Sequence, residues 1–474
     1  MQKFLIDKVF LPLSKLTGKI PEKMWDWVTA ISMCCIILTS FANSLGFINR
    51  YIIEAAFFCV FFGLIILAGI RPDMKPLKFS WGMLIPWLGT GAFILLTSVL
   101  VEPNNAVSAL LWLAAVPVFY LVWGNRSFEK LVILIFNGIY AAFAVFLLIS
   151  VIFFPIEGGD YMSFFANRNS LGVYAVFVYT VALIDATSQK KFCKRLVVAS
   201  VVAGVAAALL LYSNSRGGQI SAIAGTIFAV IAIVVQYGKK FLRPLARGFL
   251  PIALAVAIAL PGCIFVFEFG FNLKNGNITL FGGNSTEPTT QMPTEPDTVS
   301  PTKPPTTPPT APPAKDALDD ILNHQQDRIE QNNSVDFNSF TSGRVTLWKA
   351  YWAEVGFLGH RDDHEVFYED GSKIELSSHL TLLQIAYDYG ILAAVFFLIL
   401  NLVGGVKAVI HVWKHRDEAY VLLPLVAAVA YGSYYLVENL SSLEGGSLFF
   451  LYMLSQLPLI TKKKEVAKVE EVNG

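Results

Sequence analysis

Charged residues are scarce in this chain. Of its 474 residues only 15% are Asp, Glu, Lys or Arg, whereas 55% are hydrophobic, and the mean hydropathy is +0.56. A soluble globule of this size needs more polar surface than that to face water. The scarcity excludes a soluble protein and predicts that a lipid bilayer surrounds most of the chain.

Cysteine and an excess of basic residues are also lacking. The five cysteines lie in apolar stretches or in a basic loop, which indicates neither a disulfide framework nor a metal cluster. The net charge is only +1, whereas nucleic-acid-binding proteins gather Lys and Arg on one face, so we expect no nucleic-acid partner. The N-terminus has no short apolar stretch followed by a small-residue cleavage site, so its first apolar segment is expected to stay as an anchor.

Long hydrophobic runs are abundant instead. A helix needs ~20 mainly apolar residues to cross a hydrocarbon core of ~30 Å. The sequence therefore predicts an all-α integral membrane protein with about 12 transmembrane helices. Their approximate limits are 28–47, 51–70, 82–101, 106–123, 130–154, 170–186, 196–213, 219–236, 248–269, 380–403, 419–438 and 444–460.

The basic residues predict the orientation. With a cytoplasmic N-terminus, 25 of the 36 Lys and Arg residues fall on the inner side and 11 on the outer side, eight of these in one long loop. The short outer loops then carry only Arg50, Arg168 and Arg216. Because cytoplasmic loops concentrate Lys and Arg, this contrast predicts a multi-pass protein with both termini in the cytoplasm.

One long extracytoplasmic loop separates spans 9 and 10. Residues 285–313 contain 10 Pro and 9 Thr, which predicts an extended, solvated spacer without chemistry. From Asp316 onward, and again over Val345 to Trp352, the pattern predicts amphipathic helices. The expected organisation is helices 1–9 over 1–269, a Pro/Thr-rich spacer over 270–315, a helical loop over 316–379, and helices 10–12 with a cytoplasmic tail over 380–474.

Polar residues on the outer side are the candidates for chemistry, because ionisable groups near a bilayer are costly. Arg216 is the most informative charge: it lies in a short turn between two apolar helices and precedes two glycines. Guanidinium groups of Arg168, Arg216 and Arg344 at one depth would bind a diphosphate without a metal. The alternative is an arginine that meets lipid headgroups or pairs with Asp160 or Glu157.

Histidines supply the candidates for acid–base and metal chemistry. His379 enters span 10 directly, and an imidazole can take a proton from a hydroxyl near neutral pH, although an interfacial cap is the plainer interpretation. His360 and His364 have a spacing that binds zinc on a helix, but Gly359 and the Arg361-Asp362-Asp363 run favour a loop, so we predict no metal. The sequence also contains no P-loop, dinucleotide fingerprint or Ser-His-Asp elbow.

The order of these pieces resembles the O-antigen ligase and polymerase superfamily of bacterial membrane glycosyltransferases. The resemblance covers roughly residues 160–400. It rests on Asn167 to Gly172, Ser215 to Gly218, Ser342 to Trp348, Gly356 to Gly359, and His379 with Asp388-Tyr389-Gly390. The chain departs from the family where His379-Leu380 replaces a frequent His-Asn and where Asp388 replaces a frequent Glu.

The resemblance implies a metal-independent enzyme of the bacterial plasma (inner) membrane, without cofactors. Its partners would be an undecaprenyl-diphosphate-linked oligosaccharide donor, a glycan acceptor and membrane lipid, in surface polysaccharide biosynthesis. His379 would be catalytic and deprotonate the acceptor hydroxyl. The predicted diphosphate- and substrate-binding residues are Arg168, Asn169, Arg216, Arg344, Arg361 and Asp388.

Two other functions stay open at this stage. Twelve spans with inner termini are also common in transporters, including flippases of lipid-linked glycans, although carriers place their binding groups near mid-membrane. A non-catalytic scaffold or sensor displayed on the Pro/Thr-rich stalk is the second alternative. Within the resembled family a polymerase is slightly favoured over a ligase, because the spacer has the composition of cell-wall-spanning segments.

Overall fold

The structure, a computed structural model, describes residues 2–47, 52–156, 160–274, 344–436, 438 and 447–462. These residues are helical almost throughout, which confirms the predicted all-α fold class. The strands named in the described part are β1 (Lys78–Phe79) and β2 (Thr461–Lys462), an antiparallel pair of two residues each. Most of the predicted Pro/Thr-rich spacer, the helix expected from Asp316, and Arg50 lie outside the described residues.

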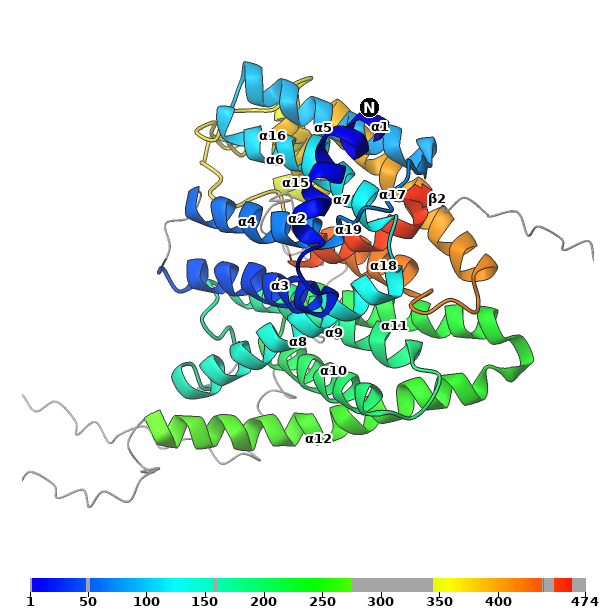
Figure 1. Cartoon of the computed structure of the whole chain (residues 1–474). Coiled ribbons are helices and arrows are strands. Elements are labelled where there is room, and N and C mark those ends of the chain that lie inside the picture. Colours follow the sequence, from blue (N-terminus) through cyan, green and yellow to red (C-terminus); the bar gives the residue numbers. More distant parts are fainter. Residues whose placement is uncertain are drawn as a thin grey trace, which may run out of the picture.

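The helices follow the apolar runs closely (Figure 1). The first half of the chain forms α1 (Gln2–Leu5), η1 (Ile6–Phe10), α2 (Leu11–Thr17), α3 (Glu22–Ser44), α4 (Ile52–Gly69), α5 (Trp81–Leu100), η2 (Pro103–Asn105), α6 (Ala106–Leu110), η3 (Leu111–Ala115), α7 (Val116–Trp123), α8 (Phe128–Phe153), α9 (Arg168–Ser188), α10 (Lys194–Ser213), α11 (Arg216–Tyr237), η4 (Gly238–Lys240) and α12 (Leu242–Lys274). The second half forms α15 (Arg344–Glu354), α16 (Thr381–Tyr389), α17 (Ile391–Lys414), α18 (Leu423–Tyr435) and α19 (Ser447–Ile460).

Nine helical segments of the described chain are long and apolar enough to cross a membrane. They fall on predicted spans, and the segment Pro103–Trp123 joins η2, α6, η3 and α7 into one of them. Ala56–Gly69 and Phe450–Ile460 are apolar but shorter. α18 has 13 residues, and at ~1.5 Å per residue it is too short to cross a hydrocarbon core unaided. A multi-pass helical membrane protein is the architecture, while the number of twelve spans stays a prediction.

Two predicted boundaries are wrong. The apolar stretch expected as one helix over 380–403 is divided at Gly390, and the helix long enough to span continues to Lys414. Gly390 has φ +94° and ψ 158°, a conformation open essentially to glycine alone, and a Cβ there would lie 2.2 Å from the carbonyl oxygen of Phe357. α12 also extends to Lys274, so the first residues assigned to the spacer are helical.

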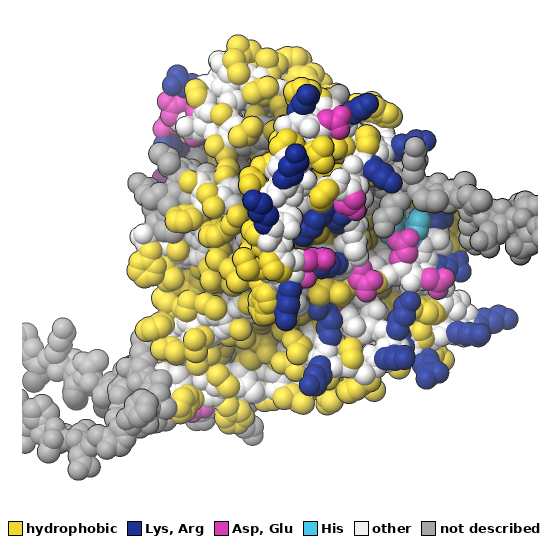
Figure 2. Space-filling view, in the orientation of Figure 1, with side chains coloured by type: hydrophobic (Ala, Val, Ile, Leu, Met, Phe, Trp, Pro, Cys, Tyr) yellow, Lys and Arg dark blue, Asp and Glu magenta, His cyan; other side chains and the backbone are white. Residues whose placement is uncertain are grey.

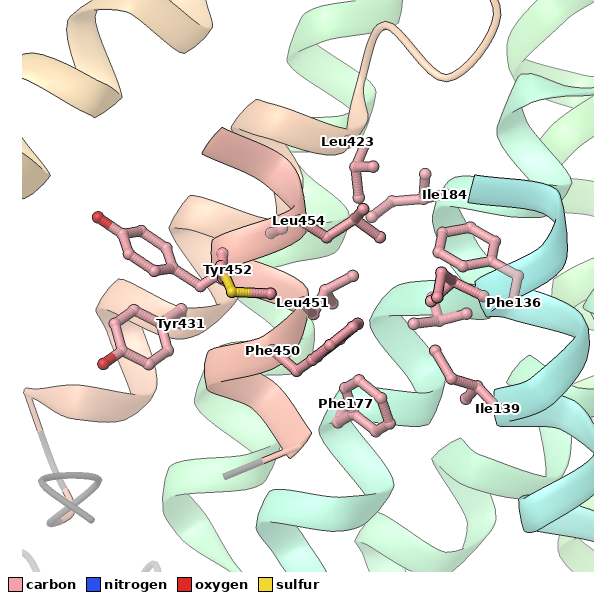
Figure 3. Packing of buried hydrophobic residues seen from close by; sticks show 14 of the residues in the cluster. Phe136, Ile139, Phe177, Ile184, Leu423, Tyr431, Phe450, Leu451, Tyr452 and Leu454 are labelled. Atoms are coloured by element: carbon pink, nitrogen blue, oxygen red, sulfur yellow. The ribbon is translucent and has the colours of Figure 1, made fainter. Parts of the chain in front are cut away.

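The core is apolar and aromatic, and α19 lies at its centre. Figure 3 shows Phe450, Leu451 and Leu454 of α19 directed toward Phe136 of α8 and Phe177 of α9, while Tyr452 faces α18. The rings of Tyr431 and Tyr452 stack with centroids 4.6 Å apart, and both side chains are buried. This packing joins the C-terminal helices to the middle of the chain.

Glycines bring several helices into close contact, as is usual between membrane helices. A Cβ on Gly204 of α10 would lie 2.6 Å from the backbone of Ala255 in α12, and one on Gly138 of α8 would lie 2.4 Å from the carbonyl oxygen of Ala30 in α3. A glycine also lets the first turns of α9 and α11 pack closely together. A Cβ on Gly172 would lie 2.2 Å from Ser215 Oγ, so these two helix starts are neighbours.

Basic side chains gather on one side of the molecule. In Figure 2 most Lys and Arg side chains lie in the right half of the view, where Figure 1 shows η4 and the C-terminal end of α17. Hydrophobic side chains dominate the rest of the visible surface. This asymmetry is what the predicted orientation requires, with the basic side in the cytoplasm.

Candidate functional site

The carboxylate of Glu438 is the centre of a polar cluster at the end of α18. Its Oε1 accepts hydrogen bonds from Arg344 Nη2 and Asn169 Nδ2, both at 2.9 Å. Its Oε2 lies 2.9 Å from His379 Nδ1. Three residues that the sequence analysis assigned to the site therefore meet on one carboxylate, from segments 169, 344 and 379 that are far apart in the chain.

Backbone contacts hold Glu438 in place. Its carbonyl oxygen accepts a hydrogen bond from Thr381 Oγ1 at 2.8 Å, and its amide donates to the carbonyl oxygen of Tyr434 at 3.0 Å. The hydroxyl of Tyr434 donates in turn to the carbonyl oxygen of Asn169 at 2.9 Å. Glu438 is only 8% exposed. Because a buried charge must be paired, these contacts hold the carboxylate in a fixed position in the site.

His379 occupies a strained turn that its neighbours enforce. Its φ is +49°, in the left-handed region that non-glycine residues seldom adopt. The carbonyl oxygen of Ser378 accepts a hydrogen bond from Trp348 Nε1 at 2.9 Å, and Ser378 Oγ donates to the carbonyl oxygen of Leu380 at 3.0 Å. Strain of this kind, about 1–3 kcal/mol, persists where the surroundings over-determine the conformation and is frequent at functional sites.

Asp388 supports this turn from a distance. Its Oδ1 accepts a hydrogen bond from Gln384 Nε2 at 2.9 Å, and Gln384 Oε1 accepts one from the amide of Ser378 at 2.9 Å. The chain of contacts runs along one face of α16 and ends at the residue before His379. The structure thus places Asp388 behind the histidine turn, where it orients Gln384.

Arg344 is the first residue of α15, which packs on α16. Leu347 and Tyr351 of α15 form a small buried cluster with Leu383 and Tyr387 of α16. The tyrosine rings meet edge to face, with centroids 5.0 Å apart. This apolar contact fixes α15 and so directs its N-terminal arginine, about a quarter exposed, to Glu438.

Arg216 and Arg168 begin two neighbouring helices beside the cluster. Ser215, the N-cap of α11, lies 3.4 Å by its Oγ from Asn169 Oδ1, which links the first turn of α11 to Glu438 through Asn169. Arg216 itself is exposed. Arg168 forms an ion pair with Asp160, one of the partners that the sequence analysis weighed for it. Two helix N-termini add positive potential to the same region.

Arg361 lies in another part of the loop, at the far end of α16. It is exposed, and its Nε is 3.6 Å from Asp363 Oδ1. Beside it the backbone amides of Asp362 and Asn104 donate to Glu102 at 3.1 Å each, and these hydrogen bonds lower the pKa of the Glu102 carboxyl. The structure does not join Arg361 to the Glu438 cluster.

Sequence reasoning missed Glu438. In the predicted topology Glu438 is only the last residue of the span 419–438, without a role. The available signal was a carboxylate at the predicted outer end of an apolar helix, where an ionisable group is costly unless it has a partner.

The geometry assigns chemical roles within the cluster. With Glu438 on Nδ1, His379 presents Nε2 as the nitrogen that can accept a proton, the tautomer logic of a carboxylate-oriented base. The guanidinium of Arg344 offers a planar donor fork for phosphate oxygens. The arrangement places an imidazole, oriented by a carboxylate, beside a guanidinium that can bind an anion.

Comparisons of the chain with protein-family models, with curated proteins and with solved structures find no match.

Proposed function

We propose that the chain is a metal-independent glycosyltransferase of the bacterial plasma membrane. It transfers or polymerises glycan from an undecaprenyl-diphosphate-linked donor onto an acceptor sugar hydroxyl at the outer face, in surface polysaccharide biosynthesis. The observation that carries the proposal is the meeting of Arg344, His379 and Asn169 on the Glu438 carboxylate. The resemblance to the O-antigen ligase and polymerase superfamily supports the same function.

In the proposed reaction the acceptor hydroxyl attacks the anomeric carbon of the donor. His379 Nε2 takes the hydroxyl proton as the new carbon–oxygen bond forms, and Glu438 orients the ring and stabilises the charge it acquires. The bond from the anomeric carbon to the diphosphate oxygen breaks, and undecaprenyl diphosphate leaves with the electron pair. Attack opposite the leaving group inverts the anomeric centre.

Arg344 and Arg216, with the positive ends of α9 and α11, would stabilise the charge that develops on the diphosphate. Preorganised cations at the position of that charge lower the barrier more than uniform tight binding does. The guanidinium of Arg344 carries five N–H donors, and one of them, on Nη2, contacts Glu438. Arg168, which is already paired with Asp160, would contribute to the electrostatic potential near the diphosphate without contacting it directly.

The test uses lipid-linked glycan extracted from a strain that lacks the chain, which supplies the unaltered donor. Purified full-length protein in vesicles should form a new glycosidic linkage and release undecaprenyl diphosphate. His379→Gln should lower the rate by roughly 10²- to 10⁴-fold, the usual contribution of a general base. The proposal fails if that variant makes product at the wild-type rate.

His415→Gln is the matched control. His415 Nδ1 lies 2.9 Å from Glu418 Oε1, so it belongs to a histidine–glutamate pair of the same geometry just after α17. Because this pair lies away from the Glu438 cluster, the control should keep wild-type product formation. A loss in both variants would point to general damage.

A flippase of lipid-linked glycan is the second candidate, because one observation favours it. Gly390 interrupts the helical run between α16 and α17, and carriers bind substrates at such interrupted helices. The same vesicles separate the two functions. Donor that crosses the bilayer with no new glycosidic bond would establish transport and reject transfer.

Polymerase and ligase differ in what accumulates when the chain is deleted. We favour polymerase, and expect single-repeat lipid-linked glycan in the deletion strain. Full-length polymer that remains unattached would establish a ligase.

A further inference from the structure

Two histidines and a glutamate meet at the far end of α16, outside the Glu438 cluster. One ligand atom from each of Glu354, His360 and His364 lies within 4.8 Å of the other two. Glu354 ends α15, and the histidines lie in the loop between α15 and α16. We propose that these three side chains bind a divalent transition-metal ion of the zinc class, an inference independent of the proposed glycosyl transfer.

The chemistry of the three groups suits zinc. Imidazole nitrogens and a carboxylate oxygen are the ligands that zinc takes in sites with three protein ligands and one open position. His364 Nε2 lies 3.4 Å from Glu354 Oε2. Two ligands at zinc-bonding distances in a tetrahedron lie ~3.3 Å apart, so this pair already has the spacing of one tetrahedral edge.

A hydrogen bond orients His360 as metal-bound histidines are usually oriented. His360 Nδ1 lies 3.1 Å from the carbonyl oxygen of Tyr387, which makes Nδ1 the protonated nitrogen and directs the metal to Nε2. The imidazole also contacts the ring of Tyr387, with centroids 4.5 Å apart, and the ring of His364, with centroids 4.3 Å apart. The ring is therefore held before any ion binds.

The backbone around the histidines is also fixed. The amide of His360 donates to the carbonyl oxygen of Tyr387 at 3.1 Å, and the amide of Gly359 donates to Thr97 Oγ1 at 3.4 Å. A Cβ on Gly359 would lie 1.8 Å from the carbonyl oxygen of Asp388, so the loop reaches α16 at backbone distance. The C-terminal end of α16 carries negative potential, which favours a cation there.

An open coordination position has room beside the ligands. A surface cavity of about 340 Å³ is lined by Val101, Gly359, His360, Arg361, Asp363, His364 and Glu365. The expectation of no metal came from the loop pattern around the two histidines, and no sequence spacing points to Glu354 as a third ligand. The loop folds back on α15 and brings Glu354 to the histidines.

The ion would join the end of α15 to the loop and, through Tyr387, to α16. His379 precedes the other end of α16, and nine residues at ~1.5 Å each put ~13 Å between the two ends. The metal is thus remote from the proposed reacting groups, and its role is to hold the loop in place.

In the test, full-length protein in detergent is first stripped of metal with a chelator. Zn²⁺ is then titrated into it and binding is measured by calorimetry, with Mg²⁺ as the contrasting ion. We expect one equivalent of Zn²⁺ that is lost in His364→Ala and in Glu354→Gln, with no matching Mg²⁺ binding. Co²⁺ at the same site should give the visible absorption of tetrahedral coordination. The proposal is overturned if both variants bind as much Zn²⁺ as the wild type, or if the bound equivalent is lost only when the cysteines are replaced.

Two controls keep the outcome clear. Glu365→Gln changes a neighbouring carboxylate that pairs with Lys373 at 2.6 Å, and it should leave Zn²⁺ binding unchanged. Glu354 is about two-fifths exposed at the end of α15, so Glu354→Gln should preserve the fold, which circular dichroism and gel filtration would verify. Equal loss of Zn²⁺ in Glu365→Gln would count against the three-ligand site.

Discussion

Glu438 couples three polar side chains of the candidate site. A carboxylate that is largely removed from solvent is stable only when charged or hydrogen-bonding partners surround it. Arg344, Asn169 and His379 supply these partners from α15, α9 and the turn before α16. A change at this one residue therefore alters both the guanidinium and the imidazole.

Glu438→Gln should separate the orientation of His379 from the binding of the lipid-linked donor. The amide keeps the size of the side chain but removes the charge that orients His379 and would stabilise its protonated form. We expect kcat for glycan transfer to fall on the order of 10²-fold, in line with the loss of an orienting partner. KM for the lipid-linked donor should change much less, because in the proposed reaction Arg216 would still bind the diphosphate.

Steady-state kinetics in detergent, with the extracted donor, give both values. Asp160→Asn is the comparison, because it removes a carboxylate that pairs with Arg168 but has no contact with His379 among the described contacts. A Glu438→Gln enzyme with wild-type kcat would remove the orienting role from Glu438.

At the scale of secondary structure, the division at Gly390 fixes where α16 ends and α17 begins. Gly390 lies between Tyr389, the last residue of α16, and the start of α17. No other residue type readily adopts its backbone conformation. Thr97 Oγ1 donates to the carbonyl oxygen of Tyr389 at 3.1 Å, and the amide of Ile391 donates to the carbonyl oxygen of Gly356 at 3.0 Å. These contacts join α5 and the loop to the division.

Gly390→Ala should destabilise the fold markedly. Conformational strain alone costs about 1–3 kcal/mol, and the added Cβ would also meet the carbonyl oxygen of Phe357 at 2.2 Å. Gly371→Ala is the matched control, because Gly371 has φ +81° and no atom within 4 Å of an added Cβ. The apparent Tm in detergent should fall clearly further for Gly390→Ala, and equal shifts would contradict the steric argument.

Glu102 predicts a pH dependence for the docking of the loop on α5. Hydrogen bonds from the amides of Asp362 and Asn104 lower its pKa in the folded state. A lowered carboxyl pKa stabilises the docked loop above the unfolded pKa of ~4.3, and this stabilisation is lost as the pH falls through the folded pKa. Docking should hold at neutral pH and weaken in acid.

Hydrogen exchange of the Asp362 amide would measure this docking. Wild type should exchange more slowly than Glu102→Gln at neutral pH, and the two should converge below the folded pKa. The comparison at each pH cancels the intrinsic pH dependence of exchange. A difference that persists fully in strong acid would show that the carboxylate charge is not the cause.

The sequence could predict the helices but not their meeting points. Apolar runs near ~20 residues specify membrane helices, because length and hydropathy are local properties. Arg344, Asn169 and His379 were recognisable as polar residues at predicted outer ends. No local pattern encodes how α15 folds back on α16. The sequence therefore could not show that Glu438 is their common partner, or that Glu354 is the third group beside two histidines.

At the scale of the whole molecule, the two sides differ in charge. Basic side chains gather on the side of η4 and the C-terminal end of α17 (Figure 2), while the Glu438 cluster involves the N-terminal ends of α9, α15 and α16. The proposed reaction requires the second side to face outward. Orientation therefore bears directly on function.

Single cysteines can test the orientation in a chain whose five cysteines are replaced. Lys239→Cys lies in the exposed turn η4, and Glu369→Cys in the exposed loop between α15 and α16. A membrane-impermeant maleimide added to intact cells should label position 369, and should label position 239 only after permeabilisation. Of the described helices between them, only α12 is long and apolar enough to cross the bilayer, so labelling from opposite sides is the outcome expected if α12 crosses.

The labelling result constrains the mechanism as well as the topology. If position 239 alone reacts in intact cells, the cluster of Glu438, His379 and Arg344 faces the cytoplasm. Transfer at the outer face would then be impossible, even if purified protein formed glycosidic bonds. If both positions react equally, α12 lies along the surface of the membrane, and its exposed apolar residues Leu254, Ile258 and Phe265 would have to contact the lipid interface.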